Sequence, residues 1–114
     1  MLTVDKLRAY GAQVDAGLER CMKNEAFYLR LVQMELNDPN FAGLDAALAA
    51  GDAKAAFEAA HALKGAVGNL ALTPIFEPVS ELTELLRAAD GTVHPGDLPA
   101  RVQKAYQDLK ALAD

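Results

Sequence analysis

Helix-breaking signals at short intervals are the feature that most limits how this chain can fold. They separate segments whose apolar residues recur every three or four positions, which is the period of an amphipathic helix. The predicted helices cover about 3–22, 24–36, 41–50, 52–70, 74–89 and 98–112. The first of them is interrupted near Gly11. Because short connections make consecutive helices antiparallel neighbours, we expect an all-α fold, an antiparallel four-helix bundle with an additional short N-terminal helix.

The composition favours helices over a sheet. Hydrophobic residues make up 52% of the 114 residues, and most of them are Ala and Leu. Both are strong helix formers, whereas strands prefer β-branched and aromatic residues. The length suits one domain over residues 1–114. We expect its bundle core at about 24–112, with residues 1–23 as an N-terminal helical extension.

Charge and hydropathy exclude several classes of partner. The formal net charge is −5 and the sequence contains no Lys/Arg cluster, which argues against a nucleic acid partner. No apolar run approaches the roughly 20 residues that span a bilayer. The first ten residues carry charges where a signal peptide is apolar. Cys21 is the single cysteine, so an internal disulfide is excluded. We expect a cytoplasmic protein without membrane insertion.

The segment 52–70 carries a histidine and two glycines on one predicted helix face. At about 100° per residue, Leu63, Val67 and Leu70 fall roughly 120–180° away from His61 and form the expected core stripe. The residues within about 60° of His61 are Lys54, Phe57, Glu58, Lys64, Gly65 and Gly68. The histidine is therefore predicted to lie on the face opposite the core.

The two glycines need an explanation because each costs about 0.5–1 kcal/mol of helix stability relative to alanine. Gly65 and Gly68 either give a partner access to the imidazole, or they allow another helix to pack closely. Phe57, one turn before His61, is either a docking contact or is covered by a neighbouring helix. The position opposite the core stripe favours steric clearance for the glycines.

A phosphoryl group on the imidazole would account for this set of residues. Imidazole is nucleophilic in its neutral form, which predominates at neutral pH. Lys64, three residues after His61, would place an ammonium beside a negative group on the ring. The sequence shows no Walker A pattern and no Gly-rich nucleotide loop. We therefore expect a chain that holds a phosphoryl group without kinase or nucleotide-binding apparatus of its own.

The stretch HALKGAVGNLAL resembles the signature of histidine-containing phosphotransfer (Hpt) domains, His-x-Leu-Lys-Gly followed by small residues. The flanking ALAAGDAKAAFEAA and SELTELLRAA resemble the same family, and the similarity covers about 24–112. The resemblance implies a four-helix bundle of a multistep phosphorelay in two-component signal transduction. Its histidine accepts a phosphoryl group from a receiver-domain aspartate and passes it to another response regulator.

The resemblance also assigns roles to individual residues. His61 becomes the phosphoacceptor that carries the phosphohistidine, Lys64 the phosphate-stabilising residue and Gly65 the residue that leaves clearance beside the ring. A polar side chain of the next helix often orients the imidazole in this family. The candidates for that role here are Glu81, Thr83 and Glu84.

The chain departs from the family at one position. Family members often have a further glycine where this chain has Ala71, a difference that concerns local packing near the helix end.

The partners implied by the family are response-regulator receiver domains and a hybrid sensor histidine kinase. Mg²⁺ is expected on the receiver, so this chain is expected to bind no metal or other cofactor of its own. The role requires only a monomer.

Two other functions stay open from the residues alone. One is a non-catalytic helical interaction module, which would bind receivers or other partners without phosphotransfer. The other is a metal- or haem-binding bundle that uses His61. It has weak support, because the only other histidine, His94, lies in a predicted loop and Glu58 is the sole nearby acidic residue.

Overall fold

The computed structural model describes residues 1–89 and 94–114, and that part of the chain is helical without a strand. The all-α prediction is confirmed. The helices are α1 (Val4–Tyr10), α2 (Val14–Arg20), α3 (Glu25–Glu35), α4 (Asn40–Ala49), α5 (Ala53–Asn69), α6 (Thr73–Arg87) and α7 (Leu98–Leu112). The predicted break near Gly11 separates α1 from α2, so the N-terminal extension holds two short helices rather than one.

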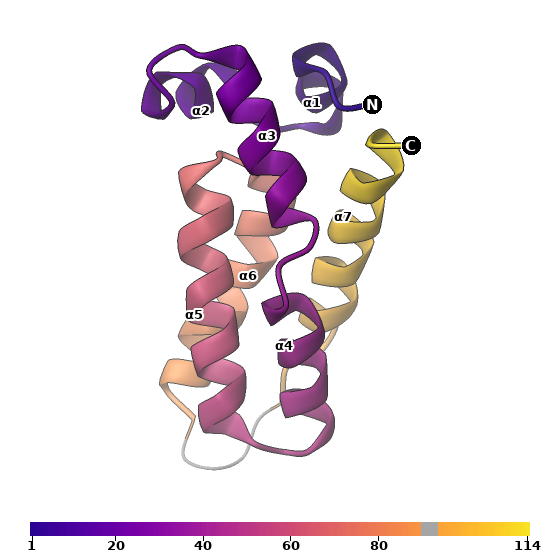
Figure 1. The fold of residues 1–114 in the computed structure, drawn as a ribbon. Helices are drawn as coiled ribbons and strands as arrows, with labels where there is room; N and C mark the ends of the chain where they lie inside the picture. Colours follow the sequence, from indigo (N-terminus) through magenta and orange to yellow (C-terminus); the bar gives the residue numbers. More distant parts are fainter. Residues whose placement is uncertain (90–93) are drawn as a thin grey trace.

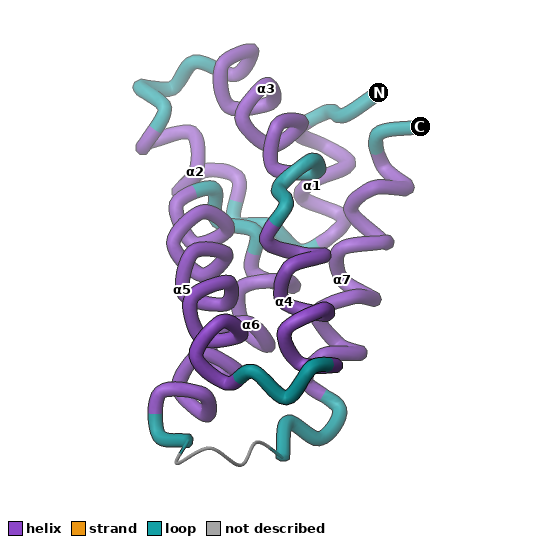
Figure 2. The backbone as a smooth tube through the Cα atoms, turned by 60° about the horizontal axis from the view of Figure 1, so that its bottom comes forward, coloured by secondary structure: helices purple, strands orange, loops and turns teal. Residues whose placement is uncertain are grey.

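The helices α4 to α7 lie side by side, as both views of the backbone show (Figures 1 and 2). The helix α4 packs against α5, α5 against α6, and α6 against α7. The first and last of the four also meet, because Phe41 of α4 stacks on Tyr106 of α7 with ring centroids 3.9 Å apart. The four helices therefore enclose a common apolar interior.

The N-terminal helices belong to the same hydrophobic core. They lie across one end of α4 to α7 (Figure 1). Leu7 of α1 and Val14 of α2 are buried in one cluster with Leu63 of α5. A Cβ atom on Gly17 of α2 would lie 2.5 Å from the ring of Tyr28 in α3, so these two helices are in close contact. Residues 1–23 thus complete the core instead of projecting from it.

All three tyrosines of the chain tie distant segments together through their hydroxyl groups. Tyr10 of α1, Tyr28 of α3 and Tyr106 of α7 each donate a hydrogen bond to a backbone carbonyl. The acceptors are the carbonyls of Ala105, Leu70 and Leu36, at 2.7, 2.9 and 2.6 Å. Burial raises the pKa of Tyr28 to about 12, so its hydroxyl remains a donor across the physiological range. The bonds from Tyr28 and Tyr106 hold the C-terminal ends of α5 and α3, and the bond from Tyr10 ties α1 to the middle of α7.

The end of α5 is closed by a turn that usually needs glycine. The Leu72 N–H donates to the Val67 carbonyl and the Ala71 N–H to the Gly68 carbonyl, which is the Schellman pattern. Its central residue takes a left-handed conformation, and Ala71 has φ +58°. The same pattern ends α4, where Gly51 with φ +71° occupies that position. The departure from the family at Ala71 therefore places an L side chain in a strained conformation.

Replacing Ala71 with glycine is expected to raise the free energy of unfolding by about 1 kcal/mol, because a left-handed non-glycine residue costs roughly 1–2 kcal/mol. Urea unfolding followed by circular dichroism measures the change. Ala62→Gly is the matched control, since Ala62 lies in the exposed middle of α5 and should lose about 0.5–1 kcal/mol. Destabilisation of similar size in both variants would show that the strain at Ala71 is absent.

A buried carboxyl group lies at the break between α3 and α4. Glu35 is 9% exposed, and its Oε2 atom has no hydrogen-bond partner among the residues that the structure describes. Burial raises the pKa of the Glu35 carboxyl to about 8, and the neighbouring Asp38 raises it further. Asp38 in turn accepts a hydrogen bond from the Asn40 N–H at the start of α4. The break is thus built around a carboxyl group that stays protonated at neutral pH.

This geometry makes stability depend on pH. The folded chain keeps a proton on Glu35 up to about pH 8, whereas the unfolded chain releases it near pH 4.5. The free energy of unfolding should therefore decrease as the pH rises from about 4.5 to about 8. Glu35→Gln removes this titration and should be more stable than the wild type at pH 8 by at least about 1 kcal/mol. Urea unfolding of the wild type and of Glu35→Gln at several pH values from 5 to 8 tests this prediction. If the free energy of unfolding changed with pH equally in the two proteins, the titration of Glu35 would not be its cause.

Candidate functional site

The helix α5 presents His61 to solvent because its other face is committed to the core. The helix begins after Asp52, whose side chain accepts a hydrogen bond from the Ala55 N–H at 3.0 Å. Four side chains on one stripe are fully buried, namely Ala56, Ala60, Leu63 and Val67. His61 lies on the opposite side and is exposed. The prediction that His61 faces away from the core is confirmed.

Lys64 reaches from α5 to a pair of charged residues on α6. Its ammonium Nζ lies 3.5 Å from Oε1 of Glu84, and the side chain is 30% exposed. The other carboxylate oxygen of Glu84, Oε2, accepts a hydrogen bond from Nε of Arg87 at 3.2 Å. Arg87, and then Lys64, lower the pKa of the Glu84 carboxyl. One carboxylate therefore binds two cations, and one of them, Lys64, lies three residues after His61 on α5.

Phe57 connects Arg87 back to the imidazole. The ring of Phe57 is half-buried, and its centroid lies 5.6 Å from that of His61. The guanidinium carbon of Arg87 lies 5.0 Å from the centre of the same phenyl ring, a cation–π distance. Phe57 is thus covered in part by α6, which was one of the two explanations for an aromatic residue on this face. We call Phe57, His61, Lys64, Glu84 and Arg87 the His61 cluster.

The two glycines of α5 have different surroundings. A Cβ atom on Gly65 would meet nothing within 4 Å, so this position opens directly to solvent one turn after His61. A Cβ atom on Gly68 would lie 2.9 Å from the Phe76 ring of α6. The expectation that Gly68 provides clearance is therefore wrong, because the neighbouring helix occupies that space. Close helix packing explains Gly68, and open space distinguishes Gly65.

The three candidates for orienting the imidazole separate clearly. Thr83 is fully buried and its hydroxyl donates to the Val79 carbonyl at 2.7 Å. Glu81 accepts a hydrogen bond from Arg101 of α7, on the other side of α6. Glu84 is directed toward α5, where its partner is Lys64. Glu81 pairs with α7 and is therefore wrong as an orienter, whereas an orienting role for Thr83 stays a prediction.

Arg87 was not predicted from the sequence as a site residue. Its placement depends on how α6 is rotated against α5, which the sequence of α6 alone does not specify. The available signal was its position three residues after Glu84, the spacing of a helical ion pair.

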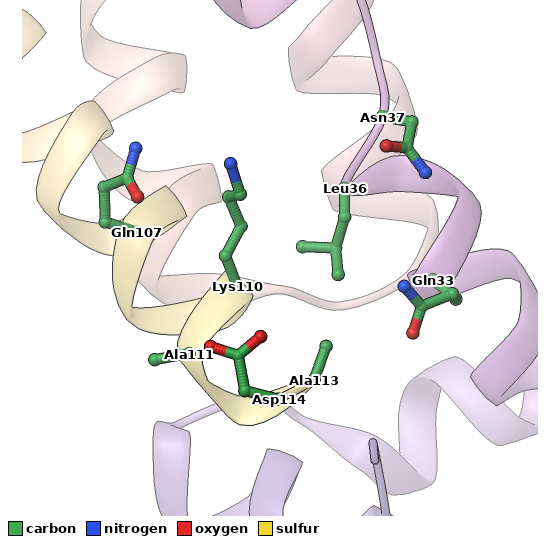
Figure 3. Close-up of a pocket in the computed structure, with 8 residues that line it drawn as sticks. All are labelled: Gln33, Leu36, Asn37, Gln107, Lys110, Ala111, Ala113 and Asp114. Atoms are coloured by element: carbon green, nitrogen blue, oxygen red, sulfur yellow. The ribbon is translucent and has the colours of Figure 1, made fainter.

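Two hollows on the described part of the surface lie apart from the exposed imidazole. One hollow of about 340 Å³ lies between the C-terminal end of α3 and the end of α7, and the residues that line it include Leu36, Gln107 and Lys110 (Figure 3). Another, of about 580 Å³, adjoins the His61 cluster and is lined by Lys54, Phe57 and Arg87 among others. His61 lines neither of them. Because the imidazole is exposed, it is accessible from solvent.

A comparison with protein-family models identifies the chain. The model of the Hpt domain matches residues 28–112, which is most of its length. The chain belongs to the Hpt domain family. This match supports the resemblance drawn from the sequence and indicates a role in histidine phosphotransfer within phosphorelays. No curated protein and no solved structure matches the chain.

The match places this Hpt domain on α3 to α7 and leaves α1 and α2 outside it. It begins at Tyr28, inside α3, and ends at Leu112, the last residue of α7. All five residues of the His61 cluster lie within it. In the described part of the chain, no helix has both the length and the apolar character needed to cross a membrane.

The contrast between the glycines of this Hpt domain can be tested by stability. Gly65→Ala should raise the free energy of unfolding by about 0.5–1 kcal/mol, because the methyl group enters open space on a helix. Gly68→Ala should lower it by about 1 kcal/mol, because the Phe76 ring has to move. Thermal unfolding of the two variants measures both changes. Equal stabilisation by the two substitutions would contradict the packing role of Gly68.

Proposed function

We propose that this Hpt domain is a phosphorelay intermediate, in which His61 accepts a phosphoryl group from the aspartate of a receiver domain and passes it to another response regulator. The observation that carries the proposal is an exposed imidazole, with an ammonium group and a side-chain-free surface on the following helical turn. The match to the Hpt domain supports the general role. In this proposal the helices α4 to α7 form the antiparallel four-helix bundle typical of the family.

The reaction needs one nucleophile from this chain. The lone pair of an unprotonated imidazole nitrogen of His61 attacks phosphorus. The bond between phosphorus and the aspartyl oxygen breaks, and the aspartate leaves as a carboxylate with that electron pair. The imidazole keeps the proton on its other nitrogen and then releases it to water. Transfer to the next receiver is the reverse reaction with a different carboxylate, so the exchange needs no nucleotide.

Lys64 and Gly65 have different parts in this proposal. The Lys64 ammonium lies on the turn after His61 and offsets the negative charge that arrives with the phosphoryl group. The open space over Gly65 lets the receiver bring its aspartyl phosphate close to the imidazole. The receiver supplies the aspartate and its bound Mg²⁺, and this chain supplies a positioned nucleophile and a docking surface. We propose that it acts as a cytoplasmic monomer.

The proposal predicts an acid-labile, base-stable phosphate on His61. Incubation with phosphorylated receiver domains from the same organism should label the wild-type chain, and His61→Gln should abolish that label because the nucleophile is lost. His94→Gln is the matched control and should be labelled like the wild type. Label that persists in His61→Gln would overturn the assignment. A wild-type chain that binds receivers without gaining phosphate would instead be a non-catalytic interaction module.

A further inference from the structure

The charged groups of the His61 cluster share a single carboxylate. Oε1 of Glu84 faces the ammonium of Lys64 at 3.5 Å, and Oε2 faces Nε of Arg87 at 3.2 Å. The contact to Lys64 crosses from α6 to α5, whereas the contact to Arg87 stays within one turn of α6. Glu84 therefore neutralises in part the cation that the proposed function assigns to the phosphoryl group.

The two cations that pair with Glu84 are held by different numbers of contacts. The guanidinium of Arg87 is fixed twice, by the carboxylate of Glu84 and by the phenyl ring of Phe57. The ammonium of Lys64 has one carboxylate at the outer limit of hydrogen-bond distance. It is also a compact charge on a flexible stem that turns readily to a new acceptor. Of the two ion pairs, the pair with Lys64 is the one that exchanges more easily.

We propose that Glu84 is a resident counter-ion of Lys64, that a phosphoryl group on His61 displaces it, and that Arg87 retains the displaced carboxylate on α6. This inference rests on the proposed function of His61. A phosphoryl group carries a charge of about −1.5 to −2 at neutral pH, against −1 for a carboxylate, so it attracts the ammonium more strongly. The exchange makes and breaks only ion pairs. Glu84 and Arg87 are positioning residues that act through Lys64.

The proposal predicts opposite effects on the phosphorylation rate of His61 when Glu84 or Arg87 is removed from α6. Without the charge of Glu84, Lys64 loses the anion with which it pairs in the described residues and is free to meet the phosphoryl group. Without Arg87, the carboxylate of Glu84 keeps Lys64 as its partner among the described residues, so it competes more strongly and repels the incoming phosphate. A purely structural role for this ion pair would instead give both losses the same sign.

The test uses phosphoramidate, a small donor that phosphorylates histidine without a receiver. Glu84→Gln should raise the rate at which His61 is phosphorylated and Arg87→Ala should lower it, each about two- to fivefold, the size expected for exposed ion pairs. The double variant should match Glu84→Gln, because Arg87 acts through that carboxylate. In a Lys64→Ala background, Glu84→Gln should have no effect.

Matched controls come from the neighbouring turn of α6. Glu81 forms an exposed ion pair with Arg101 of α7, and it lies outside the His61 cluster. Glu81→Gln and Arg101→Ala make the same changes in net charge and should leave the rate as in the wild type. Circular dichroism confirms that each variant is folded.

Each outcome decides one question. If Glu84→Gln behaves like Glu81→Gln, or if Glu84→Gln and Arg87→Ala both slow the reaction, the counter-ion role of Glu84 is overturned while His61 remains the phosphoacceptor. If the wild type gains phosphohistidine neither from phosphoramidate nor from phosphorylated receivers, the proposed function fails, and the counter-ion role fails with it.

Discussion

The packing of α5 through small side chains is the constraint on which the rest of the structure depends. Ala56 and Ala60 are fully buried, so α4 and α6 approach α5 closely along this stripe. That approach fixes the rotation of α5 about its own axis. A helix with one face fixed in this way has its opposite face fixed as well, and this opposite face carries His61. The hydrogen bond from Tyr28 to the Leu70 carbonyl then holds the far end of the same helix.

The rotation of α6 follows from the same contacts. Leu82, Thr83 and Leu86 are buried, which leaves Glu84 and Arg87 at the border between α6 and α5. The His61 cluster is therefore a consequence of core packing on two helices, although none of its charged groups belongs to the core. Its interactions are exposed and individually weak, which suits a surface whose ion pairs have to exchange when a partner arrives.

Properties that depend on one helix could be predicted from the sequence, and properties that depend on two could not. The recurrence of apolar residues every three or four positions predicted the helices. It also predicted the exposure of His61, because such a pattern buries one face of a helix and leaves the opposite face in solvent. A helical wheel placed Gly68 on the same face as Gly65. Because a wheel represents one helix without the helices packed against it, the Phe76 ring over Gly68 was not predicted. Glu81 was selected as a polar residue without knowledge of which side of α6 faces α5, and it pairs with Arg101 of α7. Arg87 was missed for the same reason.

The closing of the core by α1 and α2 has a consequence for how this chain is divided. The sequence pattern shared with the family starts at residue 28, part of the way along α3, whereas buried side chains begin at Leu2. Arg20 of α2 also binds the carbonyls of Gly68 and Asn69 at the end of the helix that carries His61. A chimera that transplants only the shared segment would expose apolar surface and free that end of α5. In this chain the segment that matches the family model is therefore shorter than the stretch of residues that shares the hydrophobic core.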